Sequence, residues 1–226
     1  MEYVLDDLRA REEELSEYLK LIEFLSKNVN ISGKNGDLFQ VTPLLLKTTK
    51  GSVYLLLYSL VESIIRESII EIHEEIERSN SSFDDLREEL QLKILRRAQR
   101  DGINIKELLS QTSSNVSLNL HKATLNRNHL FSGNVDSSNI SKVAKIYGFS
   151  SSTQFSRTGH GAQVNTVKTY RNDLAHGNKT FAAVGGQVTT EELQDFSKKV
   201  IAYIYEIIDN IQDGLEGRVY LRINMP

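Results

Sequence analysis

The residues best suited to chemistry lie together in the run RNDLAHG, from Arg171 to Gly177. Arg171, Asn172 and His176 supply a guanidinium, a carboxamide and an imidazole within six residues. An imidazole can accept and donate a proton near neutral pH. A guanidinium can stabilise the charge that develops on a phosphate, and a carboxamide can position the reacting group. This combination predicts a site that holds and cleaves a phosphodiester.

A single helix from residue 162 to 177 is expected to position these side chains. Its apolar residues recur at helical spacing, which is typical of a helix packed on a core; they are Val164, Val167, Tyr170, Leu174 and Ala175. Asn172 and His176 are four residues apart and share one side of this helix, and the long Arg171 side chain can reach the same point. Gly177 then offers the left-handed conformation at which helices commonly end.

A structural explanation for the same residues stays open. Histidine and glycine are ordinary residues at the C-terminal end of a helix, and Asp173 with His176 could form a simple surface pair. An arginine followed by a histidine five residues later is also a pattern that occurs by chance. A second, independent observation is needed to decide between a functional and a structural role for these residues.

The charge distribution supplies that observation. Residues 111–182 contain eight basic and two acidic side chains, an excess of six positive charges, whereas the whole chain has a net charge of −3. The motif therefore lies in a basic stretch of an acidic protein, as suits a polyanionic ligand whose phosphates are neutralised by Lys and Arg. Three further cations are candidates for RNA binding: Lys168, Lys179 and Arg157.

Composition excludes several other classes of protein. The chain has 226 residues, 39% of them hydrophobic and 25% charged, which is enough for one good core. It has no cysteine, and its acidic start lacks the apolar segment of a signal peptide. No apolar run approaches the length of a membrane span, so we expect a cytoplasmic protein. A P-loop, a dinucleotide-binding glycine pattern and a carboxylate metal motif are missing, and we expect no metal or cofactor.

The periodicity predicts an all-α protein, an antiparallel bundle of four to five long helices in one domain over residues 1–226. Helices are expected at 2–28, at 51–78, from Asp84 to about Arg100, across the motif, and after Thr189, with a loop over 28–50. A basic, Ser- and Asn-rich insertion with small helices is expected at about 104–160.

Glu62 interrupts the most hydrophobic of these helices. An unpaired buried carboxylate would cost several kcal/mol, so we expect a partner, and Arg66 is the nearest candidate one turn later. An ion pair with a structural role is one interpretation of Glu62. A supporting role beside Arg171 and His176 is the other.

The sequence resembles one known superfamily at two places. RNDLAHG, preceded by VKTY and followed by an apolar-striped helix, is similar to the signature of the HEPN superfamily (higher eukaryote and prokaryote nucleotide-binding). Nuclease members of that superfamily have Arg, a polar residue, three residues and His. The run YLLLYSLVESIIRESI resembles the central helix of one branch of HEPN nucleases. The resemblance covers residues 50–80 and 162–213 and little of the middle.

This resemblance implies a metal-independent ribonuclease in a toxin–antitoxin or defence setting. It implies a homodimer with an active site built across the interface, and an antitoxin protein as a candidate partner. His176, Arg171 and Asn172 would be the catalytic residues, with Asp173 and Glu62 in support. The competing hypothesis is a non-catalytic helical module that binds a nucleotide or a protein through the same surface.

Overall fold

A computed structural model describes residues 1–100 and 134–222 of the chain. Almost all regular structure in these residues is helical, so the all-α prediction is confirmed. The described residues group into two compact units. Two long helices, α2 (Pro43–Arg78) and α10 (Thr190–Glu216), each contribute residues to both units. We call residues 2–64 and 153–205 the motif unit, because it contains Arg171 to His176. The other unit consists of residue 1 and the described residues in the ranges 65–152 and 206–226.

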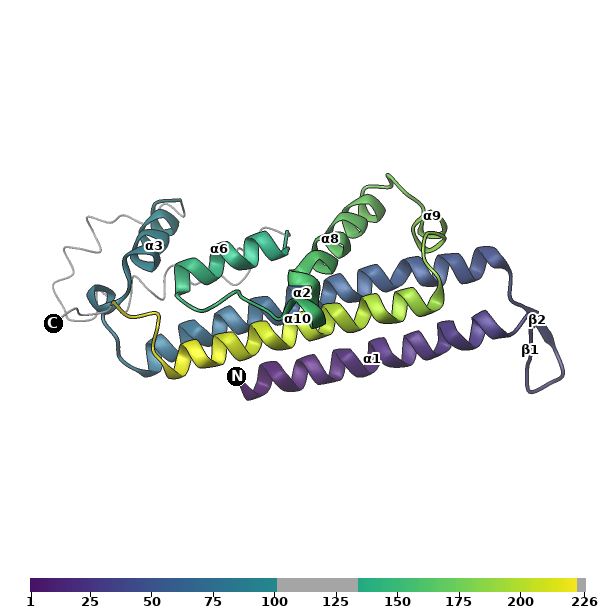
Figure 1. Cartoon of the computed structure of the whole chain (residues 1–226), viewed down its shortest axis with the longest axis horizontal. Helices are drawn as coiled ribbons and strands as arrows, with labels where there is room; N and C mark the ends of the chain where they lie inside the picture. The colour runs from purple at the N-terminus through teal and green to yellow at the C-terminus, as the bar shows by residue number, and fades with distance from the viewer. Residues whose placement is uncertain (101–133, 223–226) are drawn as a thin grey trace. The chain divides into compact units, whose positions relative to one another are not determined.

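Three long helices make the frame of the motif unit: α1 (Glu2–Lys27), α2 (Pro43–Arg78) and α10 (Thr190–Glu216) (Figure 1). Their pairing is fixed by polar contacts between side chains. The Tyr18 and Ser52 hydroxyl groups lie 2.7 Å apart, and the Tyr205 hydroxyl donates to Glu12 at 2.8 Å. A Gln194–Glu23 hydrogen bond adds a second contact between α1 and α10, and the Ser63 hydroxyl donates to Asp7 at 3.5 Å as a second contact between α1 and α2. In both pairs, a later residue of α1 meets an earlier residue of its partner, so α1 is antiparallel to both. In consequence, α2 and α10 run in the same direction.

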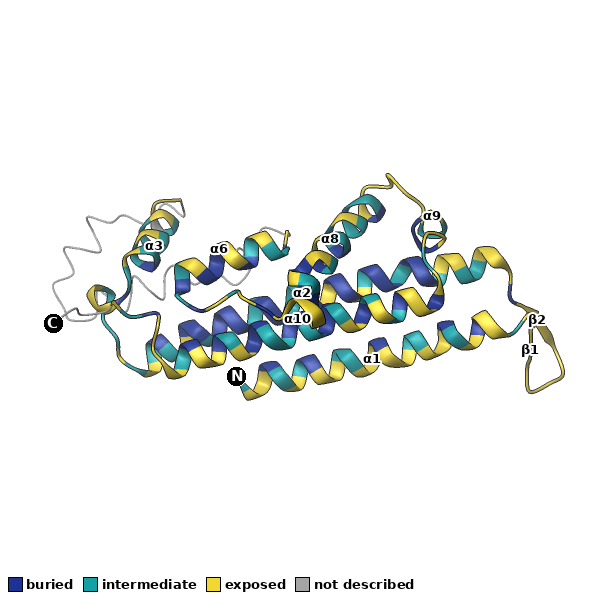
Figure 2. Ribbon diagram, viewed as in Figure 1, coloured by how far each residue is buried: buried dark blue, intermediate teal, exposed yellow. Residues whose placement is uncertain are grey.

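Burial follows the expected apolar periodicity. Figure 2 shows exposed and buried residues alternating along α1, which has one core face and one solvated face. The buried side chains of α2 surround much more of that helix in this unit; they are Val53, Tyr54, Leu57, Tyr58, Leu60, Val61 and Ile64. A helix that is apolar around most of its circumference belongs in the interior of a bundle, and α2 occupies that place.

The loop expected over residues 28–50 is the main error of the sequence interpretation. α2 begins at Pro43, eight residues before the predicted start. Proline is well placed in the first turn of a helix, where its missing N–H is not needed, and the Thr42 hydroxyl accepts from the Leu45 N–H at 3.1 Å. The remaining segment forms a two-stranded antiparallel hairpin, β1 (Asn30–Ser32) and β2 (Leu38–Gln40).

The other unit contains η1 (Phe83–Asp85), α3 (Glu88–Arg100) and α6 (Ser137–Tyr147). α6 is one of the small helices expected in the insertion, and Gly148 ends it with a φ of 93°. Its last residue, Tyr147, is fully buried against His73 of α2, whose Nε2 lies 2.7 Å from the tyrosine hydroxyl. Residues 101–133, which include the insertion's Lys122 and Arg127, lie outside the described part of the chain.

Two glycines allow the segment after the motif to pack directly on α2. Gly185 ends the short helix α9 (Phe181–Gly185), and Gly51 lies in the first half of α2. A Cβ atom at Gly51 would lie 2.2 Å from the Phe181 carbonyl oxygen, and one at Gly185 would lie 2.0 Å from the Lys47 carbonyl oxygen. Both positions require backbone-to-backbone contact that no side chain permits.

Gly51→Ala is therefore expected to destabilise the protein by about 1–3 kcal/mol, although alanine normally favours a helix over glycine by about 1 kcal/mol. The free energy of unfolding from urea denaturation measures this change. Gly33→Ala is the matched control, because the nearest atom to its Cβ would be 3.6 Å away. A Gly51→Ala variant as stable as the parent would contradict the close packing of α9 on α2.

Among the described residues, no helix is long and apolar enough to cross a membrane.

Candidate functional site

The motif helix is α8 (Ala162–Ala175), which begins where the sequence predicts and ends two residues before the predicted end. Its N-terminal end follows α7 (Phe155–Thr158) and the turn η3 (Gly159–Gly161). Val164, Val167 and Leu174 are buried and fasten the helix to the core, and Tyr170 is half-buried. Ala175 is exposed, so its assignment to the buried stripe was wrong: the stripe ends one residue earlier, as the helix leaves the core.

The helix ends at His176 and Gly177 as expected. His176 occupies the C-cap position, and its backbone N–H donates to the Asn172 carbonyl oxygen at 3.0 Å. Gly177 follows with a φ of 71°, the left-handed conformation that favours glycine. The His176 side chain is exposed, and within residues 1–100 and 134–222 no hydrogen bond or ion pair occupies its ring nitrogens. The imidazole is accordingly accessible to a ligand at this end of the helix.

Arg171 is held on two sides. Its guanidinium carbon lies 4.3 Å from the centroid of the Tyr58 ring, within the range of a cation–π interaction. Its Nη1 donates a hydrogen bond to the Asn172 Oδ1 at 2.8 Å. Because a guanidinium can only donate, the carboxamide must turn its oxygen toward Arg171. The structure thus brings two of the three predicted catalytic residues into direct contact.

A second set of contacts fixes the chain on the other side of Gly177. The Lys179 ammonium forms an ion pair with Asp173 at 2.7 Å, and the backbone N–H of Asn178 donates to the Asp173 carbonyl oxygen at 2.8 Å. The Lys179 hydrogen bond lowers the pKa of Asp173. Asp173 therefore pairs with Lys179 in this structure, and the surface pair considered between Asp173 and His176 does not form. Lys179 also lies 5.1 Å above the Tyr170 ring.

Tyr170 continues this set of contacts into the core. Its ring meets the ring of Tyr54 edge to face, with centroids 4.7 Å apart, and its hydroxyl donates to Gln187 at 2.6 Å. Tyr54 is 1% exposed, and burial raises its pKa to about 12, so it stays neutral. The buried Lys50 side chain donates to the Val188 carbonyl oxygen next to Gln187. The loop after the motif is thereby attached to α2 at several points.

Glu62 does not have the partner predicted for it. The side chain is half-buried, and in the described part of the chain no ion pair joins it to Arg66. The expectation assumed full burial, whereas a partly exposed carboxylate keeps much of its hydration and needs no counter-charge. A supporting role for Glu62 at the site stays a prediction.

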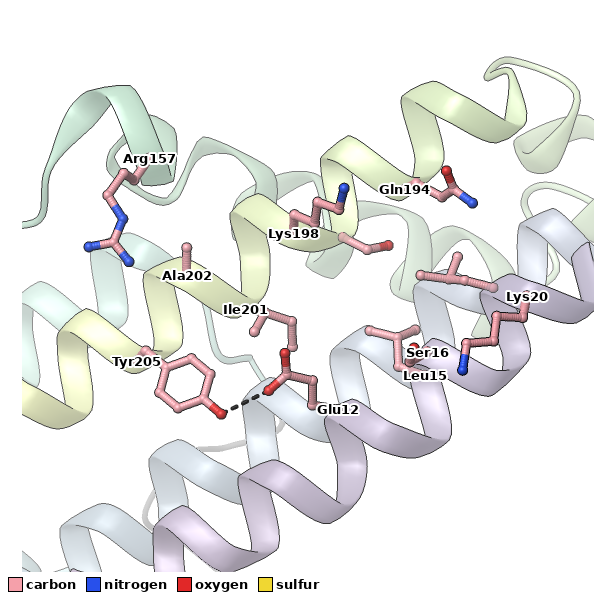
Figure 3. A pocket seen from close by; sticks show the side chains of 12 residues that line it. Glu12, Leu15, Ser16, Lys20, Arg157, Gln194, Lys198, Ile201, Ala202 and Tyr205 are labelled. Carbon is pink, nitrogen blue, oxygen red and sulfur yellow. Dashed lines mark hydrogen bonds between the residues drawn. The ribbon is translucent and has the colours of Figure 1, made fainter. Parts of the chain in front are cut away.

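The basic residues proposed for RNA binding lie on different elements of the motif unit. Lys179 is ion-paired directly after the motif, and Lys168 lies half-buried on α8. Arg157 lines a groove of about 490 Å³ with residues of α1 and α10 (Figure 3). Lys20 and Lys198 share this groove, one end of which is bridged by the Tyr205–Glu12 hydrogen bond. Its lining contains none of Arg171, Asn172 and His176, so RNA contact by Arg157 stays a prediction for a different surface.

Sequence reasoning missed the two tyrosines that support the motif. Tyr54 and Tyr58 lie one turn apart on α2, and both are buried. Tyr54 contacts Tyr170, and Tyr58 contacts the next residue in the chain, Arg171. The signal that could have revealed them is the pair of aromatic residues, four apart, in a largely aliphatic run.

Comparison with known proteins gives one match. The sequence model of the HEPN_MAE_28990-like HEPN family matches residues 2–220, nearly the whole chain. No curated protein and no solved structure matches the chain.

Proposed function

The chain belongs to the HEPN_MAE_28990-like HEPN family, and from that premise we propose that it is an endoribonuclease that cleaves RNA without a metal ion. HEPN domains are generally associated with ribonucleases. The observation that carries the proposal is the arrangement at the end of α8. There a guanidinium is held by Tyr58 and Asn172, and an accessible imidazole follows at the C-cap.

These groups match the needs of cleavage by the RNA's own 2′-hydroxyl. Such a reaction requires proton transfer at the attacking and leaving oxygens, and stabilisation of the extra charge on the phosphorane. His176 would transfer protons, Arg171 would face the phosphate, and Asn172 would contribute to positioning. No additional nucleophile has to be supplied by the protein.

One motif provides one histidine, whereas in-line cleavage benefits from both a base and an acid. We therefore place the active site across a homodimer in which the two copies of the α8 C-terminal end face each other. An isologous contact is the simplest way to bring two His176 side chains to one phosphate.

This dimer predicts a sedimentation coefficient in analytical ultracentrifugation that corresponds to twice the chain mass of 25.6 kDa at micromolar concentration. A variant with a bulky charged side chain at the exposed Asn178, such as Asn178→Glu, should shift the equilibrium toward monomer and lose cleavage with it. Thr169→Glu, on an exposed part of α8 before the motif, is the control. A protein that is monomeric throughout and cleaves RNA would overturn the composite site.

The direct test of the function uses purified protein and mixed cellular RNA in EDTA. Cleavage under these conditions supports the proposal, and its loss in His176→Ala excludes a contaminating nuclease. RNA binding without cleavage would favour the non-catalytic module instead.

We place the activity in a toxin–antitoxin or defence setting, with a neutralising protein as its partner.

A further inference from the structure

Tyr58 of α2 contacts Arg171 through the face of its aromatic ring. The side chain is 4% exposed, and the guanidinium carbon of Arg171 lies 4.3 Å from the ring centroid. On α2, the neighbouring buried positions Leu57, Leu60 and Val61 are all aliphatic. Unlike these aliphatic neighbours, the Tyr58 ring can attract the Arg171 cation.

We propose that Tyr58 is a positioning residue that presents the Arg171 guanidinium to the scissile phosphate. The inference rests on the proposed ribonuclease function. The ring lies against the guanidinium carbon at 4.3 Å, while the Asn172 Oδ1 accepts a hydrogen bond from Nη1 at 2.8 Å. Neither contact uses the other N–H donors of the guanidinium, and phosphate oxygens can accept from them.

The physical advantage is preorganisation. An unrestrained arginine loses much rotamer freedom when it binds a phosphate, and that loss weakens the interaction. An arginine already stacked and hydrogen-bonded loses less of this freedom, so more of its electrostatic attraction lowers the barrier. The Asn172 side-chain oxygen accepts a hydrogen bond from Arg171. Part of the effect of Asn172 on cleavage is therefore expected to act through the position of Arg171.

Tyr54 provides a matched control for a merely structural role. It is also a buried tyrosine, one turn earlier on the same helix, but its ring meets Tyr170 and Phe196. Replacing either tyrosine with leucine removes a similar aromatic volume from the core. Only the Tyr58 replacement removes a ring from the face of Arg171.

The kinetic test compares Tyr58→Phe, Tyr58→Leu and Tyr54→Leu under single-turnover conditions at saturating RNA, well below the melting temperature of each variant. Tyr58→Leu should lower the cleavage rate by about 5- to 30-fold, the range of a partly desolvated cation–π contact. Tyr58→Phe keeps the ring and should stay within about twofold. Tyr54→Leu should lose stability with a smaller change in rate.

A double-mutant cycle identifies the route of the effect. Affinity is measured for an RNA that has a 2′-deoxynucleotide at the cleavage site, so that binding is read without reaction. Tyr58→Leu should weaken this binding in the parent protein but have no further effect in Arg171→Ala. Equal losses in both backgrounds would show that Tyr58 acts on the fold and would overturn the proposal.

A third measurement needs no RNA and separates this inference from the proposed function. In a ¹⁵N–¹H NMR spectrum, the Arg171 Nε–H signal, assigned by its absence in Arg171→Ala, should show an upfield ring-current shift. Tyr58→Phe should retain the shift and Tyr58→Leu should lose it. An unshifted signal in the parent protein overturns the positioning role. If the signal is shifted but the protein cleaves no RNA, the contact between Tyr58 and Arg171 is supported and the proposed ribonuclease function is contradicted.

Discussion

His176→Ala is expected to lower the rate of RNA cleavage by about 100- to 10,000-fold, the usual contribution of a general acid or base. The side chain is exposed at the C-cap of α8, and its removal opens no cavity. Helical content and melting temperature should therefore stay close to those of the parent protein. Circular dichroism and single-turnover cleavage of a mapped RNA substrate measure the two effects separately.

The control for this variant is His160→Ala, because His160 is also exposed and belongs to the same unit but lies outside the motif. It should cleave RNA at nearly the parent rate. A His176→Ala protein that unfolds would favour the capping interpretation of the histidine. A His176→Ala protein that is folded and fully active would show that His176 has no part in the cleavage reaction.

Arg171→Ala should lower cleavage by about 100- to 1,000-fold, because it removes a preorganised cation from the developing charge. The cost in stability should be about 1–2 kcal/mol, since the residue is half-buried and its guanidinium contacts the Tyr58 ring. Arg171→Lys keeps the charge but not the planar fork, and should recover only part of the activity. Asn172→Ala should be milder than either replacement, since positioning is shared with other groups.

A single 2′-deoxynucleotide at a mapped cleavage site is expected to abolish cutting there, because the substrate then lacks its nucleophile. Residues of the motif can move protons and neutralise charge, but they do not activate water strongly. The products of the normal RNA should end in a 2′,3′-cyclic phosphate and a 5′-hydroxyl, and mass spectrometry can identify both. DNA of the same sequence should resist.

The matched control is an RNA with its 2′-deoxynucleotide one position away from the cleavage site, which should be cut normally. Affinity for both substituted RNAs should be nearly that of the parent RNA, so that a loss of binding does not imitate a loss of chemistry. Continued cutting at the deoxy position, or strict dependence on Mg²⁺, would show that the assigned chemistry is wrong.

The sequence by itself determined those features that depend on local interactions. The spacing of Val164, Val167 and Leu174 places α8 and its buried face. Gly177 and His176 set its end, and Thr189 with Glu192 starts α10 through two reciprocal hydrogen bonds. Each of these signals lies within one or two helical turns, which is why they can be recognised without knowing the partners of the helix.

Only the tertiary structure decided what surrounds the motif. Tyr58 and Arg171 are separated by more than a hundred residues, so no periodicity connects them, and the ring face that holds the guanidinium could not be inferred. The surroundings of Arg157 could not be inferred from the sequence either. Arg157 lies in the same basic stretch as Arg171, but it lines the groove beside α1. Charge along a sequence reports which cations are near in the chain. The packing of α1, α2, α8 and α10 decides which of them face the same ligand.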